Sequence, residues 1–331
     1  MSFRANVNPN GGRPVFELFD DESGASARVL PSYGFNLFDL RLPAAGTIRR
    51  AVAARDDWEK TPDKPARNGV PILFPYPGRI AFAKFSFDGK EYELPPAKAP
   101  HAIHGFAHEA SWDVVEHVAD ATSARLKGRF QISKQTPQFS SGWPADAILE
   151  VEYALAGRRL TMTTTVVNPS EHVLPFGFGI HPYFHLPLDP SGDPARTKAI
   201  FPASRFWVLK DSLPTGDRVE VDARLDFRRG QSMKGLALDD VLTDLTFEGE
   251  HCVCRLIDEA LGAEFRLGFD SGFRELVVFT PAGNEDRVIA VEPYTQAPDA
   301  VHLEARGIDA GLKSLKAGER STMAIVFETV G

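Results

Sequence analysis

The chain contains little cysteine, no long apolar run and no block of basic residues. Only two of its 331 residues are cysteines, Cys252 and Cys254, and no apolar stretch is long enough to cross a membrane. Residues 1–12 lack the apolar core of a signal peptide. We therefore expect a reduced, cytoplasmic protein with no membrane partner. The two thiols are expected to pack on one face of a strand rather than to form a disulfide.

Several kinds of site are also missing. The formal charge of −8 and the lack of a Lys/Arg cluster argue against a nucleic-acid partner. The Gly-x-Gly at 177–179 is not followed by the further glycine and helix that a dinucleotide site needs. A Gly-x-Ser-x-Gly nucleophile elbow is absent as well. We therefore expect no cofactor of these kinds.

The chain does contain many short runs with the composition of strands. A hairpin is predicted around the Asp-Gly turn at 88–89, and residues 69–80 predict a rigid loop because of their three prolines. A turn is predicted at 213–216, and a helix competes only at 300–313, where two glycines weaken it. Hydrophobic residues make up 43% of the chain, which suffices for a large core. The fold prediction is all-β: one large antiparallel β-sandwich domain over 1–331, with few short helices. The strands are expected at 16–18, 27–30, 35–42, 85–94 (as the hairpin), 112–118, 124–132, 148–155, 159–168, 201–209, 252–258, 263–270, 276–280, 288–292 and 321–329.

Five side chains that are scattered along the chain could carry chemistry: Arg79, His104, His181, Asp239 and Glu292. His181 follows two glycines and precedes a proline, so its backbone is expected to be extended and rigid beside aromatic rings. Glu292 ends an apolar strand, where loss of water would raise its pKa and make it a usable base. Taken alone, the two histidines could be packed in the core, and Arg79 and Glu292 could form ion pairs. Asp239 is expected in an acidic loop and alone indicates almost nothing. Together they suit a polyhydroxylated substrate.

A metal site is the alternative use of the histidines. His101, His104 and His108 are close in sequence, as are His181 and His185, and Glu292 could complete a site. In a strand, however, His181 and His185 would lie about 13 Å apart, too far to share one ion. We therefore expect proton transfer and no metal.

Seven motifs follow one another along the chain: V-L-P-S-Y-G-F-N-L at 29–37, G-V-P-I-L-F-P to G-R-I at 69–80, I-H-G-F-A at 103–107, G-I-H-P-Y-F at 179–184, L-P-T-G at 213–216, L-D-D-V at 238–241 and V-E-P at 291–293. In this order and spacing they resemble the motifs of the aldose 1-epimerase (galactose mutarotase-like) family. His108 stands where many relatives closest to this pattern have arginine. In the aspartate segment Asp239 and Asp240 both fit, and the spacing to the next apolar residue favours Asp239.

The resemblance implies a β-sandwich with its site in a cleft on one sheet and a cofactor-independent isomerase that interconverts the anomers of a hexose. By resemblance Glu292 is the base, His181 the acid, and His104 stabilises charge at the ring oxygen. Arg79 and Asp239 would bind hydroxyl groups, and Trp207 is expected to contact the sugar. The choice of sugar is expected to depend on the segments 57–68 and 207–214.

Three alternatives remain open. A hexose-6-phosphate 1-epimerase of the same family would need a cationic pocket, for which Arg49-Arg50 and Arg228-Arg229 are possible donors. A carbohydrate-binding or sugar-sensing protein would keep the pocket without turnover, although it would not need an acid opposite a base. The third alternative is a metal-dependent lyase or isomerase. The protein is expected to be a monomer or a homodimer.

Overall fold

The computed structural model describes residues 3–96, 99–283 and 287–331. Within these ranges the largest sheet has nine antiparallel strands in the order β11-β12-β13-β14-β28-β24-β23-β18-β21. Side chains along β12 and β14 alternate between buried and partly exposed, as the period of two predicts. The strands are β11 (Asp113–Ala119), β12 (Ala124–Gln131), β13 (Ile148–Ala156), β14 (Arg159–Val167), β28 (Arg320–Val330), β24 (Ala263–Asp270), β23 (His251–Asp258), β18 (Thr197–Ile200) and β21 (Gln231–Ser232).

A second sheet follows the order β20-β19-β22-β25-β26-β16-β6, with β17 also paired to β26. Glu292 lies on β26, in the interior of this sheet. Because strands pair on both sides of β26, its inward side chains are shielded from water. The strands are β20 (Leu213–Glu220), β19 (Ala203–Lys210), β22 (Asp239–Leu245), β25 (Glu275–Phe279), β26 (Val288–Tyr294), β16 (Gly179–Ile180), β6 (Ile72–Leu73) and β17 (Tyr183–His185).

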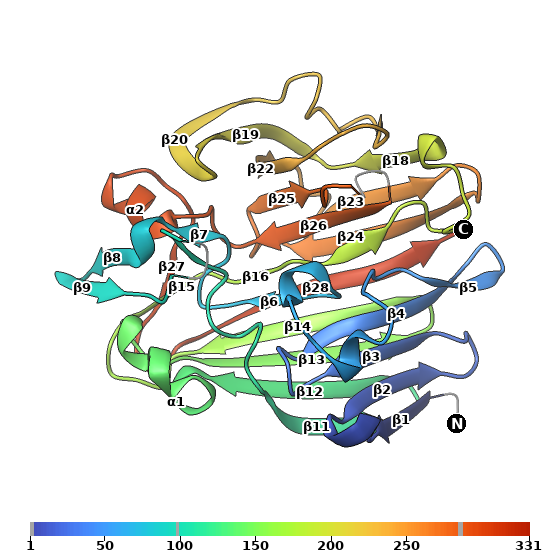
Figure 1. The fold of residues 1–331 in the computed structure, drawn as a ribbon, viewed down its shortest axis with the longest axis horizontal. Coiled ribbons are helices and arrows are strands. Elements are labelled where there is room, and N and C mark those ends of the chain that lie inside the picture. Colours follow the sequence, from blue (N-terminus) through green and yellow to red (C-terminus); the bar gives the residue numbers. More distant parts are fainter. Residues whose placement is uncertain (1–2, 97–98, 284–286) are drawn as a thin grey trace.

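A third sheet is formed by the N-terminal strands in sequence order (Figure 1). Strands β2 and β4 contact the large sheet, and an isolated bridge between Val52 and Phe184 joins this region to β17. The Phe184 ring packs 4.6 Å from that of Phe265 on the large sheet. The two smaller sheets thus share a core with the large one. The N-terminal strands are β1 (Phe3–Asn8), β2 (Val15–Asp20), β3 (Ser26–Leu30), β4 (Asn36–Ala44) and β5 (Thr47–Arg50).

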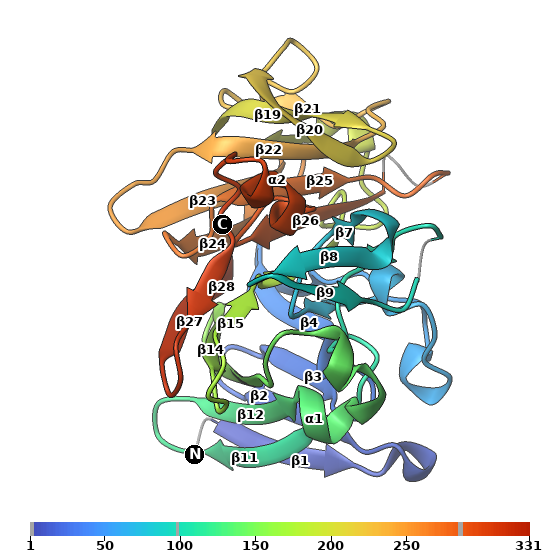
Figure 2. The same cartoon turned by 90° about the vertical axis from the view of Figure 1, so that its left-hand side faces the viewer.

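Short elements cover the edges of these layers, with α2 and the β8–β9 hairpin together at one end (Figures 1 and 2). Three small pairs are β7 (Arg79–Ile80) with β10 (Ala102–Ile103), β8 (Lys84–Phe87) with β9 (Lys90–Glu93), and β15 (Leu174–Phe176) with β27 (Lys313–Leu315). No helix within the described ranges is long and apolar enough to span a membrane. The helices are η1 (Asn10–Gly12), η2 (Trp58–Lys60), η3 (Pro65–Arg67), η4 (Ala81–Ala83), α1 (Ile132–Gln135), η5 (Pro137–Gly142), η6 (Pro194–Arg196) and α2 (Ala300–Ala305).

The predicted all-β class is confirmed, but two local predictions are wrong. Residues 213–216 are not a turn, because they begin strand β20, and the chain reverses at Asp211 and Ser212 instead. Both of these residues have positive φ, and β20 lies at the edge of its sheet, where Pro214 is tolerated. Asp239 does not lie in an acidic loop but opens strand β22.

Candidate active site

A cavity of about 550 Å³ opens over the second sheet, a size usual for a small-molecule site. Its floor comes from strands β22, β25 and β26, and its walls come from loops that are far apart in sequence. The lining residues are Lys64, Pro65, Ala66, Arg67, Gly78, Arg79, Ile103, His104, His108, Glu109, His181, Tyr183, Leu209, Ser212, Asp239, Val241, Val277, Phe279, Glu292, Tyr294 and Pro298. Five of the six side chains that the sequence singled out therefore meet in one place.

Glu292 lies in the floor of the cavity and is 1% exposed. One carboxylate oxygen, Oε2, accepts a hydrogen bond of 2.5 Å from the Tyr294 hydroxyl. The other, Oε1, lies 3.2 Å from Nε2 of His181. Burial raises the pKa of the Glu292 carboxyl; the Tyr294 hydrogen bond opposes this shift, and the negative charge of Asp239 adds to it.

His181 lies between the short strands β16 and β17, where its backbone N–H donates to the carbonyl of Pro71 at 2.9 Å. Its ring stacks on that of Tyr183, with centroids 4.7 Å apart and planes 15° apart. The Tyr183 hydroxyl lies 3.3 Å from Nε2 of the same histidine. Burial lowers the pKa of His181 to about 3, so its ring is neutral at neutral pH.

Glycines before His181 allow this close packing. A Cβ on Gly179 would lie 2.5 Å from the ring of Tyr294, the residue that binds Glu292. A Cβ on Gly177 would lie 2.3 Å from the side chain of Gln296. The Gly-x-Gly pattern therefore serves close approach of β16 to its neighbour β26, not a phosphate.

His104 reaches the cavity from a strained turn. Its φ is +66°, and its backbone N–H donates to the carbonyl of Gly78 at 2.9 Å. Nδ1 accepts a hydrogen bond from the Gly78 N–H at 3.3 Å, so the neutral ring carries its proton on Nε2. The rings of His181 and His108 lie 5.6 Å and 6.2 Å from that of His104. Burial lowers the pKa of His108 to about 4, so this third ring adds no charge at neutral pH.

Arg79 and Asp239 line the cavity from two different strands, β7 and β22. Arg79 pairs in β7 with Ile103 of β10, and its carbonyl accepts a hydrogen bond from the backbone of Asp299 at 2.7 Å. Asp239 lines the cavity from the start of β22. The neighbouring Asp240 is instead held by Arg224 through two hydrogen bonds of 2.8 and 2.7 Å.

The position of Trp207 does not suit the role that the sequence suggested. Its side chain does not line the cavity and is 1% exposed. The indole donates from Nε1 to Oε2 of the buried Glu275 at 2.9 Å, and the guanidinium of Arg218 lies over its ring at 5.0 Å. Trp207 packs in one apolar cluster with Val241, which lines the cavity, so it supports the floor from the side, on the same face of the sheet.

Sequence reasoning missed two groups of lining residues. Tyr294 lies two positions after Glu292 on one strand, so a period of two could have placed it on the same face. Lys64 and Arg67 lie in the segment expected to affect sugar choice, but a charged loop carries no local signal of where it folds. The expected phosphate donors do not reach the cavity: Arg49 is bound to Asp189 and Arg228 to Asp226. Among the described residues, no three His, Cys, Asp or Glu side chains are placed to share a metal ion.

The family model of aldose 1-epimerase matches residues 19–328, nearly the whole chain. The chain belongs to the aldose 1-epimerase family. Curated relatives include the uncharacterised Escherichia coli protein YphB, 28% identical over 160 residues, which are 47% of this chain and 49% of that protein. Rat galactose mutarotase is 29% identical over 139 residues, or 42% of this chain and 38% of that protein. The chain thus spans half or less of the length of these curated relatives.

Solved structures agree on the fold. A galactose mutarotase-like protein from Clostridium acetobutylicum superposes with a TM-score of 0.88 at 20% identity, covering 99% of this chain and 98% of that one. Galactose 1-epimerase from Lactobacillus acidophilus does so with a TM-score of 0.76 at 17% identity, covering 99% of both chains. At these identities the likeness establishes the galactose mutarotase-like fold, and activity has to be argued from the site.

Proposed function

We propose that the protein is an aldose 1-epimerase that interconverts the α and β anomers of a hexose. The observation that carries this proposal is the pair of Glu292 and His181, whose carboxylate and imidazole lie 3.2 Å apart inside the cavity. Ring opening needs such a pair, because one sugar oxygen must lose a proton while the ring oxygen gains one.

In this mechanism Glu292 accepts the proton of the C1 hydroxyl, and His181 donates a proton to the ring oxygen. The C1–O5 bond breaks, its electron pair stays on the ring oxygen, and C1 becomes an aldehyde. Rotation about C1–C2 then presents the other face of the aldehyde to the C5 hydroxyl. Closure by the reverse proton transfers yields the other anomer and restores both side chains.

The pKa shifts of the pair favour one of the two proton distributions that this cycle uses. Burial raises the pKa of the Glu292 carboxyl and lowers that of His181 to about 3, so both shifts favour a proton on Glu292 over a proton on His181. In the mechanism, the proton is on Glu292 while the sugar is the open aldehyde. It must be on His181 when the closed sugar ring is about to open. The proton can thus pass between the two groups, through the sugar, without exchange with solvent.

The remaining residues bind and orient the sugar. His104 carries its proton on Nε2, beside His181, and in this account donates a hydrogen bond to the ring oxygen as charge develops there. Arg79 and Asp239, on the cavity wall, hold hydroxyl groups. None of these steps uses a cofactor.

Polarimetry on freshly dissolved α-D-glucose and α-D-galactose tests the proposal. The protein is expected to accelerate the approach to the equilibrium rotation for at least one sugar, in proportion to its concentration. Protein in which His181 is replaced by Asn serves as the control, because it retains the cavity but lacks the acid. Equal rates with and without the wild-type protein on both sugars would contradict the proposal for these hexoses.

A further inference from the structure

Two cations, Lys64 and Arg67, line the mouth of the cavity, and both are exposed. We call them the mouth cations. Arg79 adds a third positive charge to the lining, whereas the carboxylates there are Glu109, Asp239 and the buried Glu292. The lining thus holds as many cations as carboxylates, whereas the chain as a whole carries a formal charge of −8, so positive charge is enriched at the cavity relative to the whole protein.

The mouth cations have no acidic partner among the residues that the structure describes, whereas other cations of the same loop do. Arg55 lies 3.1 Å from Asp63, and Lys60 lies 2.9 Å from Asp57. Asp57 and Asp63 are therefore paired with cations that do not line the cavity. The charges at the mouth remain available to a ligand.

The loop that carries the mouth cations is firmly held in place. Lys64 has a φ of +45° directly before a proline, an unfavourable backbone that surrounding contacts must maintain. The buried Trp58 donates from Nε1 to the carbonyl of Asp63 at 2.8 Å. The buried Asn68 donates from Nδ2 to the carbonyl of Lys64 at 3.2 Å. The loop is thus a built part of the cavity wall.

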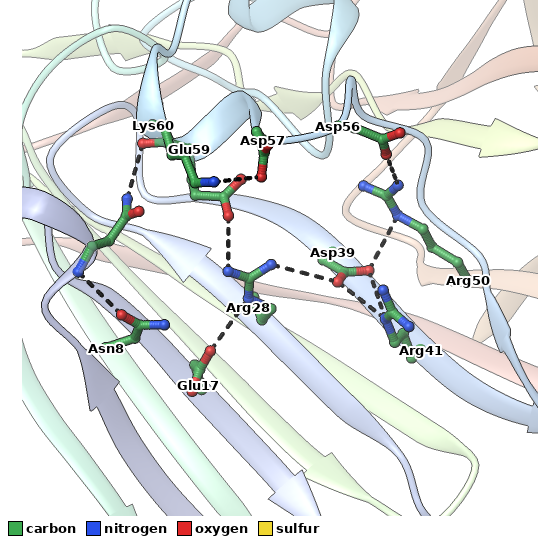
Figure 3. A network of polar contacts seen from close by, with 11 residues as sticks. Asn8, Glu17, Arg28, Asp39, Arg41, Arg50, Asp56, Asp57, Glu59 and Lys60 are labelled. Carbon is green, nitrogen blue, oxygen red and sulfur yellow. Dashed lines mark hydrogen bonds and ion pairs between the residues drawn. The ribbon is translucent and has the colours of Figure 1, made fainter.

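The same loop is tied to the N-terminal sheet by ion pairs, which Figure 3 shows. Glu59 accepts a hydrogen bond of 2.9 Å from Arg28 of strand β3, and Asp56 lies 3.5 Å from Arg50 of strand β5. These contacts hold the part of the loop that contains Asp56 and Glu59 on the sheet. The part that contains the mouth cations lines the cavity.

A short chain of contacts connects the mouth cations to the acid of the proposed reaction. The Tyr183 hydroxyl donates to the carbonyl of Ala66 at 2.5 Å, and the Tyr183 ring stacks on His181. Ala66 lies directly between Pro65 and Arg67 in the helix η3. The positive charge of Arg67 is close enough to lower the pKa of Tyr183, against the effect of burial.

From this arrangement we infer that the substrate is a sugar that bears an oxyanion, a phosphate or a carboxylate, away from C1. The oxyanion binds Lys64 and Arg67 while C1 and the ring oxygen meet Glu292 and His181. A guanidinium matches the two oxygens of such a group, and the ammonium adds a second charge. The inference rests on the proposed function and narrows its substrate class.

Rates of anomer exchange measured by NMR with four sugars test the inference. Glucose and galactose are the neutral substrates, and glucose 6-phosphate and glucuronic acid are the anionic ones. We expect kcat/KM for one anionic sugar to exceed that for both neutral sugars by about tenfold or more, as charge-assisted hydrogen bonds allow. The faster of the two anionic sugars identifies the oxyanion as phosphate or carboxylate.

The double variant K64Q/R67Q is expected to lower the ratio of anionic to neutral kcat/KM by about tenfold. The control K234Q/R320Q removes the same charge at two exposed positions that do not line the cavity, and should leave this ratio unchanged. Turnover of neutral sugars without an anionic preference, or an equal loss for both classes in K64Q/R67Q, would overturn the inference alone. No acceleration with any of the four sugars would overturn the proposed function as well.

Discussion

At the scale of single residues, the pKa of Glu292 is set by burial and by two neighbours with opposite effects. The Tyr294 hydroxyl donates to Oε2 at 2.5 Å and stabilises the ionised carboxylate, which lowers the pKa. The charge of Asp239 raises it. Burial is the largest cause and raises it further, so the carboxyl binds its proton at a pH where an exposed glutamate would be ionised.

These opposing effects predict opposite shifts in a pH profile. The active pair holds one proton, so activity falls on the alkaline side as this last proton is lost from the pair. Tyr294→Phe removes a hydrogen bond to the carboxylate, raises the pKa of Glu292 and moves the alkaline limb of kcat/KM to higher pH, by about one unit. Asp239→Asn removes a negative charge and moves it to lower pH.

The limb is measured from anomer exchange between about pH 5 and 10 in the wild type and both variants. A loss of sugar binding alone lowers kcat/KM at every pH but does not shift the alkaline limb. The position of the limb therefore reports the pKa of the Glu292 carboxyl. Limbs that coincide in all three proteins would contradict the assignment of Tyr294 and Asp239 as neighbours that tune Glu292.

At the scale of elements, turns with positive φ bring distant side chains to the cavity. Gly105 follows His104 with a φ of +70°, and a Cβ there would lie 2.1 Å from the carbonyl oxygen of Phe74. The loop before β7 and the turn after β10 therefore pack backbone against backbone. This contact sets the position of His104 relative to His181.

Gly105→Ala is expected to lower the free energy of unfolding by about 2–4 kcal/mol, because it adds a clash to an unfavourable φ. Gly89→Ala is the matched control, with a φ of +71° and nothing within 4 Å of the new Cβ. It should cost only about 1 kcal/mol. Urea denaturation of the two variants measures the difference, and equal stabilities would show that the contact with Phe74 is not needed.

Sequence alone predicted those elements whose signals are local. The Asp-Gly turn at 88–89 and the strand expected at 159–168, now β14, depend on neighbours in the chain, and both were predicted correctly. The reversal at Asp211 and Ser212 was missed, because two non-glycine residues adopt positive φ there. Trp207 was expected at the sugar, but its burial beside the cavity floor depends on pairing between β19 and β22, which no local pattern reveals.

The part of the candidate site that could be predicted from the sequence is the set of residues that lie in recognisable motifs and can transfer protons. His104, His181 and Glu292 were found in this way, and the structure brings them to one cavity. Burial raises the pKa of Glu292 and lowers that of His181. The apolar residues before Glu292 already indicated the burial of its carboxyl. Lys64 and Arg67 could not be found, because only the folded loop brings them to the mouth.

At the scale of the whole molecule, a polar network ties the N-terminal sheet to the loop beside the cavity (Figure 3). Its centre is Asp39 on strand β4, which is almost completely buried. Arg41 and Arg50 lie 3.1 and 3.2 Å from its carboxylate, and Arg28 lies 3.8 Å away. One carboxylate thus balances charges from three strands.

Asp39→Asn should lower the free energy of unfolding by about 1–3 kcal/mol, since three guanidinium groups lose their shared counter-charge while solvent still screens them in part. Asp21→Asn is the control: it removes an exposed ion pair with Arg4, 2.6 Å long, and should lower the free energy of unfolding much less, because solvent screens this pair. Urea denaturation compares the variants. A cost for Asp39→Asn no larger than that of the control would show that the network does not stabilise the fold.

The central claim is that Glu292 and His181 act as base and acid on a bound sugar. It is tested most directly by the rate of anomer exchange in Glu292→Gln and His181→Asn, with sugar affinity measured by calorimetry on the same proteins. The account predicts that each variant still binds the sugar but loses on the order of 10²- to 10⁴-fold in rate. Exchange at the wild-type rate in either variant would contradict it.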